Sequence, residues 1–318
     1  MTAEQVKARP DTWMPTADQV GAATPEAVNS AKTAAVTESK TYTNEQVKKA
    51  APRNLLDNSD FTNPVNQRGQ TSYTEQGYTI DRWKTVGALS VTAGSDGITL
   101  ANTGTSTLRV EQTIPAKLIS SGMRYTVAIT TENGRFCGSC TLSTDAQTVI
   151  SESDFYCQIQ ISSGNAVIQI RQRGGYTTKY KNVALYEGEY TIETLPEYQP
   201  KGYAAELLEC QRYYYRIRAN WKWVASGICT STTAIAIPIK LPTAMRINPR
   251  PNIVDPSKIK IRCGSTASQV PSDVTWNFAN DIFDIIQMEA TVTGATNGAI
   301  AVLYFDNGGI IEFDADVK

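Results

Sequence analysis

Residues 155–175, FYCQIQISSGNAVIQIRQRGG, contain two runs in which apolar and polar side chains alternate. A period of two is typical of β-strands, because successive side chains point to opposite faces of a sheet. Ser163-Gly164-Asn165 stands between the runs and favours a tight turn. We therefore expect residues 155–161 to pair with residues 166–173 as an antiparallel hairpin.

The two faces of this expected hairpin differ in chemistry. One face collects the apolar side chains Cys157, Ile159, Ile161, Ile168 and Ile170. The other collects Tyr156, Gln158, Gln160, Gln169, Arg171 and Arg173. The apolar face should be core. Planar amides, guanidinium groups and aromatic rings match the hydroxyls and C–H patches of sugars, so Tyr156, Gln158, Gln160, Gln169 and Arg171 are candidate ligand-binding residues. The alternative is a solvated face, or one packed against a neighbouring chain.

The same alternation continues on both sides of the hairpin. Short strand-like segments separated by turn residues fill residues 54–200, a pattern that is typical of an antiparallel sandwich. Leu207, Leu208, Tyr214 and Tyr215 then fall at helical spacing, which predicts a short helix from 204 to about 214. Strand patterns return to residue 318, with a predicted hairpin turn at residues 306–309, Asp-Asn-Gly-Gly.

The N-terminal part has a different composition. Residues 1–53 are rich in Ala, Lys and Glu, and Thr24-Pro25-Glu26 is a good helix start because it offers a capping side chain followed by proline. We predict a helix from about 25 to 50. Its apolar stripe at coiled-coil spacing is thin, with Val28, Ala31, Ala35 and Tyr42, so the helix needs partner chains or another surface.

Composition restricts the chemistry. The chain of 318 residues has no histidine, which removes the usual general base near neutral pH and the commonest transition-metal ligand. The net charge of −1 makes nucleic acid an unfavourable partner. The sequence has no apolar run of about 18 residues and no signal-peptide pattern at its start. We expect a soluble protein made in a cytoplasm, without membrane insertion, and no disulfide framework among its six irregularly spaced cysteines.

Residues 212–227, RYYYRIRANWKWVASG, hold the densest aromatic cluster. On a strand, Trp221 and Trp223 point the same way with Lys222 opposite, so the pair can form a stacking platform for a sugar ring. Both tryptophans are candidate ligand-binding residues. The alternative is an aromatic seam between domains or subunits.

Other motifs favour structural roles. Cys137-Gly138-Ser139-Cys140 lacks the further ligands that zinc needs. In the triplet Asp81-Arg82-Trp83, at the expected end of a strand, we interpret Trp83 as a core aromatic and its neighbours as an ion pair or a turn. A glycosidase could use two carboxylates, and the possible pairs are Asp281 with Asp284 and Glu312 with Asp314. Their spacing and context are those of ordinary solvent-facing residues, and nothing in the sequence indicates a catalytic acid. We expect no catalytic residues, no metal and no cofactor.

Three segments carry a resemblance. They are NLLDNSDFTNPVNQRGQ (54–70) with YTIDRW (78–83), YQPKGYAAELLECQRYYYRI (198–217), and STTAIAIPIKLPTAMRINPRPNI (231–253). Together they resemble bacteriophage and prophage tail-fibre or receptor-binding proteins that have a jelly-roll domain similar to carbohydrate-binding modules. The first 23 residues match nothing in that family.

The resemblance implies a mainly β protein in three parts. Residues 1–53 would be a coiled-coil-like helical segment that attaches to the virion and helps to form a trimer. Residues 54–200 would be a jelly-roll sandwich, and residues 201–318 a C-terminal β-sandwich at the tip, joined by the short helix. The implied function is non-enzymatic: a homotrimer in the virion tail, bound to tail or baseplate proteins through its N-terminus, that binds a bacterial surface glycan. The alternatives are a purely structural tail or baseplate component and a polysaccharide depolymerase that uses a carboxylate pair.

Overall fold

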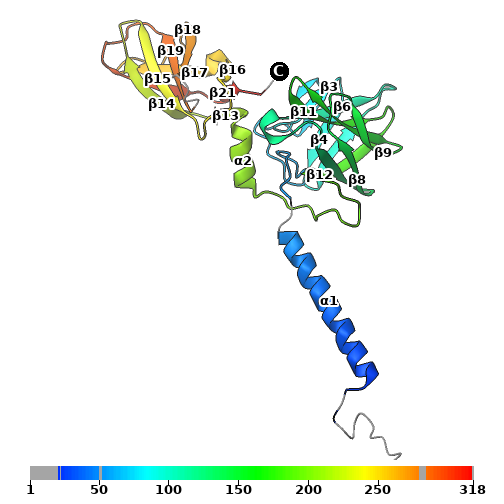
Figure 1. The fold of residues 1–318 in the computed structure, drawn as a ribbon. Helices are drawn as coiled ribbons and strands as arrows, with labels where there is room; N and C mark the ends of the chain where they lie inside the picture. Colours follow the sequence, from blue (N-terminus) through cyan, green and yellow to red (C-terminus); the bar gives the residue numbers. More distant parts are fainter. Residues whose placement is uncertain (1–20, 22, 50–51, 279–283, 317–318) are drawn as a thin grey trace, which may run out of the picture. The chain divides into compact units, whose positions relative to one another are not determined.

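The computed structural model describes residues 21, 23–49, 52–278 and 284–316, and it is mainly β, as predicted (Figure 1). Strands account for 46% of the chain and helices for 12%. The chain forms two compact units, residues 1–52 and 53–318, and each is described by itself.

In the first unit, helix α1 spans Pro25–Lys49. The hydroxyl of Thr24 accepts a hydrogen bond from the backbone N–H of Ala27 at 3.2 Å, which satisfies one of the free donors of the first turn. The apolar side chains Val28, Val36 and Tyr42 are all exposed, so residues 25–42 of α1 bury no apolar face within their own unit. The coiled-coil pairing stays a prediction, and residues 1–20 of the expected attachment segment lie outside the described residues.

The second unit begins with two six-stranded antiparallel sheets. The first has the order β1 (Ser72–Tyr73), β4 (Ser90–Gly94), β5 (Gly97–Ala101), β12 (Thr177–Glu187), β7 (Arg124–Thr131), β8 (Gly134–Thr141). The second has the order β2 (Gly77–Tyr78), β3 (Lys84–Val86), β6 (Leu108–Ile114), β11 (Asn165–Gln172), β10 (Phe155–Ser162), β9 (Gln147–Ser151). Apolar side chains from both sheets pack into one core, so the two sheets form a sandwich. A short 3-10 turn, Ala116–Leu118, follows β6.

The expected hairpin is confirmed. β10 pairs with β11 from Phe155 opposite Gln172 to Ser162 opposite Asn165. Ser163 and Gly164 have φ values of 50° and 77°, as a two-residue type I′ turn requires. The predicted apolar face does point into the core: Cys157, Ile159, Ile168 and Ile170 are fully buried, and Ile161 is partly buried.

The segment 54–65 packs beneath the sandwich around Asn58. The side-chain amide of Asn58 donates to the backbone carbonyls of Val65 and Asp81, and its side-chain oxygen accepts a hydrogen bond from the N–H of Val65. The carbonyl of Asn58 accepts from Nε1 of Trp83, whose ring is fully buried and lies edge-on to Phe61. The structural interpretation of Trp83 is therefore confirmed, but residues 81–83 lie in the turn before β3 and not at the end of a strand.

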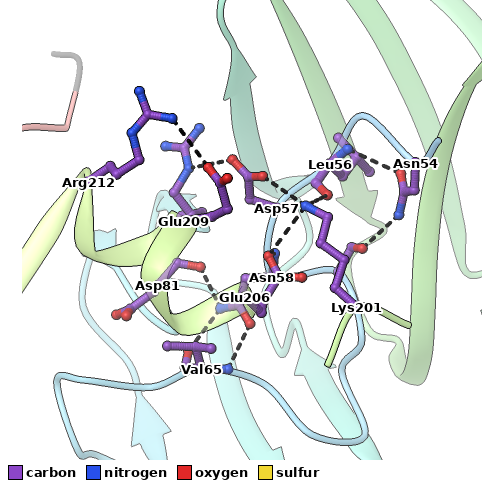
Figure 2. A network of polar contacts seen from close by, with 12 residues as sticks. Asn54, Leu56, Asp57, Asn58, Val65, Asp81, Lys201, Glu206, Glu209 and Arg212 are labelled. Carbon is purple, nitrogen blue, oxygen red and sulfur yellow. Dashed lines mark hydrogen bonds and ion pairs between the residues drawn. The ribbon is translucent and has the colours of Figure 1, made fainter. Parts of the chain in front are cut away.

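Helix α2 (Tyr203–Gln211) follows the first sandwich. We expected its apolar face to include Leu207 and Leu208, but Leu208 is exposed and the buried side chains are Glu206, Cys210 and Gln211. Figure 2 shows the reason: Oε1 of Glu206 accepts the backbone N–H of Asn58 at 2.5 Å. Asn58 is buried, so its N–H needs an acceptor within the chain, and α2 supplies one.

Two further sheets form the rest of the second unit. A three-stranded sheet has the order β13 (Tyr214–Ala219), β21 (Gly309–Asp314), β16 (Arg250–Ile253). A six-stranded sheet has the order β17 (Ile259–Cys263), β20 (Ile300–Phe305), β14 (Lys222–Cys229), β15 (Ala234–Lys240), β19 (Ile285–Thr291), β18 (Asp273–Phe278). A 3-10 turn, Pro256–Lys258, precedes β17. These sheets share a second apolar core that includes Ile237, Leu303 and Phe313.

The predicted hairpin at residues 306–309 is wrong. β20 pairs with β14 and β17, whereas β21 pairs with β13 and β16, so Asp306-Asn307-Gly308 carries the chain from one sheet to the other. The turn itself exists, because the N–H of Gly309 donates to the carbonyl of Asp306 at 3.0 Å. A turn motif specifies the reversal of the chain but not the sheet that the next strand joins.

Candidate functional site

The three-stranded sheet presents two polar rows on one face. In the first row Tyr214 and Arg250 flank Asp314, and in the second Arg216 and Asn252 flank Glu312. The rows arise because β21 is the central strand and side chains two residues apart share a face. The intervening residues Tyr215 and Phe313 stack on the opposite face at 6.4 Å between ring centroids and belong to the core.

The first sandwich supplies the facing wall of this site. Arg68 lies between two tyrosines, with its Cζ atom 5.0 Å from the ring centroid of Tyr78 and 3.8 Å from that of Tyr214. Its guanidinium also pairs with the buried carboxylate of Asp81 at 3.1 Å. Gln67 strengthens the junction, since its amide donates to Asp81 at 2.6 Å and to the carbonyl of Tyr214 at 2.7 Å. Side chains from the first sandwich and from the three-stranded sheet are therefore fixed in one arrangement.

A cleft of about 610 Å³ opens between these groups. This volume is in the range of small-molecule sites. Its side chains include Arg68, Gln70, Tyr73, Glu75, Gln76, Tyr78, Tyr214, Arg216, Arg250, Asn252, Glu312 and Asp314. The wall therefore combines aromatic rings, guanidinium groups, amides and carboxylates.

Glu312 organises the floor of the cleft. It accepts a hydrogen bond from the hydroxyl of Tyr214 at 2.7 Å and from the amide of Asn252 at 3.3 Å, and it lies 3.5 Å from Nε of Arg216. Burial and the hydrogen bond to Glu312 raise the pKa of Tyr214, so its hydroxyl remains a donor at neutral pH. Nη1 of Arg216 also donates to the carbonyl of Arg68. Arg250, by contrast, is exposed at the rim.

This arrangement suits the binding of a polar, ring-shaped ligand. The half-buried ring of Tyr78 offers some apolar area for C–H patches, while arginine, amide and carboxylate groups offer directed hydrogen bonds to hydroxyls. The carboxylates Glu312 and Asp314 are two residues apart on one strand, so their α-carbons are separated by about 6.6 Å. Both carboxylates line the same cleft.

The predicted tryptophan platform lies on the other sheet. Trp223 is on β14, but Trp221 precedes it in the turn with φ +56, so the two do not alternate on one strand as expected. Tyr304 brings them together: its ring centroid lies 6.5 Å from that of Trp221 and 5.0 Å from that of Trp223. Both tryptophans are more than half exposed. Their binding of a sugar stays a prediction.

The polar face of the hairpin forms a network of its own. Arg171 donates to Oε1 of Gln169 at 2.7 Å, and Gln169 donates to Glu111 at 3.4 Å. The amide of Gln158 donates to Thr148 at 2.9 Å. The candidate residues Tyr156, Gln158, Gln160 and Arg171 are half-buried and Gln169 is buried. A ligand at this face would compete with these internal hydrogen bonds.

The remaining candidates have structural surroundings. Cys137 and Cys140 lie on β8 as free thiols, and burial raises the pKa of both. Asp284 pairs with Lys240, while its expected partner Asp281 lies outside the described residues. Among residues 21, 23–49, 52–278 and 284–316, no three Cys, Asp or Glu side chains gather in a way that would hold a metal ion.

The sequence analysis missed most of the cleft. None of the cleft residues Arg68, Tyr78, Tyr214, Arg216, Arg250 and Asn252 was predicted as a site residue from the sequence. The available signal was alternation: residues 214 and 216 share one face of a strand, as do 312 and 314.

Comparisons with known proteins add no identification. No family model matches the chain, and no curated protein matches it. In the part of the chain that the structure describes, no helix is long and apolar enough to cross a membrane.

Proposed function

We propose that this chain is a non-enzymatic receptor-binding protein of a bacteriophage or prophage tail, which binds a bacterial surface glycan in the cleft. The observation that carries the proposal is the combination of tyrosine rings, arginines, amides and carboxylates around a volume of about 610 Å³. The sequence resemblance to tail-fibre proteins supports the setting, and the mainly β architecture agrees with it.

The proposal includes the finer organisation expected from that resemblance. Residues 54–200 would act as a jelly-roll-like domain and residues 201–318 as the tip domain. Residues 1–53 would bind tail or baseplate proteins and contribute a coiled coil to a homotrimer. Three chains would present three clefts, and the avidity of several weak sites makes adsorption to a cell surface strong.

Specific contacts can be assigned within the cleft. The exposed guanidinium of Arg250 and the amide of Asn252 are placed to donate to sugar hydroxyls or to an acidic substituent. The rings of Tyr78 and Tyr214 already stack on Arg68, which holds them in place before a ligand arrives.

Glycoside hydrolysis is a second candidate, favoured by the presence of Glu312 and Asp314 in the same cleft. A general acid must carry a proton on its carboxyl group. Glu312 instead accepts hydrogen bonds on both of its oxygens and faces Arg216, so both oxygens already have partners within the chain. We therefore favour binding without cleavage.

The test is binding of the purified full-length protein to an array of bacterial glycans, with Arg250→Ala and Arg218→Ala compared on every positive spot. Arg218 is a matched control, because it is an exposed arginine on the same sheet but does not line the cleft. We expect selective binding that Arg250→Ala weakens about tenfold, the effect of losing roughly 1.4 kcal/mol, and that Arg218→Ala leaves unchanged.

Three outcomes would change the proposal. Equal loss in both variants would remove the cleft as the site. Binding to no glycan would favour a purely structural tail component. Release of shorter saccharides that stops in Glu312→Gln would replace binding by hydrolysis.

A further inference from the structure

The six-stranded sheet of the second core has an outer face that is unusually apolar. Ile228 and Ile300 lie directly opposite each other on β14 and β20 and are 49% and 66% exposed. The next pairs along the same strands are Ser226 with Val302 and Trp223 with Tyr304. This outer face is defined here by Trp223, Ile228, Ala236, Ile300, Val302 and Tyr304.

The composition of this face is typical of an interaction surface. Inward-pointing neighbours on the same strands, such as Cys229, Ala301 and Leu303, are fully buried, so the core uses only one face of the sheet. Exposed large apolar side chains are normal when they are scattered, but a contiguous group usually marks an interaction site. Trp223, Ile228 and Ile300 are 54%, 49% and 66% exposed, and Ala236, Val302 and Tyr304 are half-buried.

The two edges of the face carry opposite charges. On one side β17 presents Lys260 and Arg262 next to Tyr304 and Val302. On the other side β18 and β19 present Asp273 and Glu289. Lys260 pairs with Asp306 of its own chain at 2.7 Å, whereas Arg262 is exposed.

The acidic side is also hollow. A groove of about 260 Å³ runs over β15, β19 and β18, where Ala234, Ala236, Thr275 and Thr291 leave room between the carboxylates of Asp273 and Glu289. The basic side is bulky by comparison, since it carries Trp223, Tyr304 and the long side chains of β17. The two halves of the face therefore complement each other in both shape and charge.

We infer that this outer face binds a second copy of the chain, with the basic edge of one copy against the acidic groove of the other. Six strands and six to seven residues per strand give a projected area of about 500 Å². A stable interface buries about 800 Å² on each partner. The whole face supplies the larger part of one side in a two-fold pair, whereas in a ring each interface uses about half of the face and needs further contacts. Opposite charges at the rim select the partner and its register, while the apolar centre supplies most of the affinity.

Two symmetries satisfy this pairing. A closed ring of chains joins each basic edge to the next acidic groove, and so does a two-fold pair whose axis runs parallel to the strands. The homotrimer of the proposed function requires the ring. The inference extends that part of the proposal and is independent of the glycan-binding part, because the cleft lies on a different sheet.

The first test uses the full-length chain with Ile300→Asp, and Ile192→Asp as the control. Ile192 is 46% exposed and belongs to the segment after the first sandwich, so it matches Ile300 in chemistry but not in place. The measurements are mass by sedimentation velocity and quenching of tryptophan fluorescence by acrylamide. Trp221 and Trp223 are the most exposed tryptophans among the described residues, so their quenching should respond to burial of this face.

We expect an oligomer for the wild type and Ile192→Asp. For Ile300→Asp we expect a monomer if this face alone joins the chains. If α1 also joins them, we expect an unchanged mass with increased quenching of tryptophan fluorescence. A monomeric wild type would overturn the inference. So would an Ile300→Asp variant with wild-type mass and wild-type quenching. Glycan binding by single clefts should stay unchanged in Ile300→Asp, which separates this test from that of the proposed function.

Charge reversal tests the pairing of the edges. Two variants place like charges opposite each other: Arg262→Glu alone, and Asp273→Lys combined with Glu289→Lys. Each should weaken association about tenfold or more, equivalent to roughly 1.4 kcal/mol. The chain that combines all three substitutions should regain association with itself and not join wild-type chains. A combined variant that remains as weak as its parents would contradict the pairing of basic with acidic edges.

Discussion

Arg82 of the first sandwich donates from Nη1 to Oδ1 of Asp316, beside the C-terminal strand, at 2.8 Å. The same guanidinium pairs with Asp57 at 3.4 Å, donates to the carbonyl of Thr113 at 2.7 Å, and lies 3.5 Å from the ring centroid of Tyr213. Both Arg82 and Asp316 are buried. This contact, together with that of Arg68 on Tyr214, fixes the two walls of the cleft against each other.

Loss of the Arg82 guanidinium should destabilise the second unit strongly. Arg82→Met keeps much of the aliphatic stem but leaves Asp316 buried without its cation and leaves Asp57 with Lys201 alone. Breaking a buried pair costs about 3 to 5 kcal/mol. Arg124→Met is the matched control, because its ion pair with Glu189 is largely exposed and is worth about 0 to 1 kcal/mol. Urea unfolding followed by tryptophan fluorescence measures both. Equal, small losses would show that Arg82 does not join the sandwiches.

Asp81 should make stability depend on pH in the direction opposite to that of an ordinary paired carboxylate. Burial raises the pKa of Asp81 from 3.8 to about 6, although Arg68 and the amide of Gln67 oppose the shift. A group whose pKa is higher in the folded state contributes stability below its unfolded pKa and loses it as the pH rises through the folded pKa. The stability that Asp81 contributes should therefore be lost as the pH rises from about 4 to about 6.

Asp81→Asn removes this titration. Between about pH 4 and pH 7, the free energy of unfolding of the wild type should fall relative to the variant by up to roughly 3 kcal/mol, the equivalent of about two pKa units. The measurement is a series of urea titrations at several pH values, with the exposed Asp145→Asn as the control. Parallel curves for the wild type and Asp81→Asn would mean that Arg68 compensates fully for the burial.

The sequence predicted the local pairing at 155–175 correctly, but it predicted a hairpin at 306–309 that does not form, and it predicted long-range pairing poorly. The 155–175 hairpin was accessible because its partners lie close in the chain and Ser163-Gly164 adopts the turn that the residue types favour. The cleft was not, because it depends on partners such as Gln67 and Tyr214, which are 147 positions apart. Alternation gives each strand two faces, but it does not say which strand lies beside it or which face is turned toward another domain.

Two errors have identifiable causes. Trp221 was placed on a strand, yet β13 and β14 belong to different sheets, so the chain turns at Asn220, whose side chain accepts the N–H of Gly308 at 2.9 Å. On α2 the spacing of the leucines favoured an apolar buried face. The backbone N–H of Asn58 instead requires a carboxylate there, and Glu206 is buried for that reason. Burial raises the pKa of Glu206, which reflects the cost of that position.

Gly138 offers a test of the packing of the first sandwich that the spacing of the neighbouring cysteines does not suggest. A Cβ atom at this position of β8 would lie 1.7 Å from the carbonyl oxygen of Val149, so a strand must move to admit it. Gly138→Ala should therefore cost roughly 3 kcal/mol or more, at or above the upper end for overpacked sites. Gly202→Ala is the control, because nothing lies within 4 Å of its added Cβ and its φ is −58°. Gly202 is the N-cap of α2, where alanine is less favourable than glycine, so this variant should lose a little stability. Thermal unfolding of both variants should show a large fall in the midpoint for Gly138→Ala and a small one for Gly202→Ala. An unchanged midpoint for Gly138→Ala would mean that β8 and the 149 segment do not approach as closely as described, and the edge of the sandwich would then have room for a larger side chain.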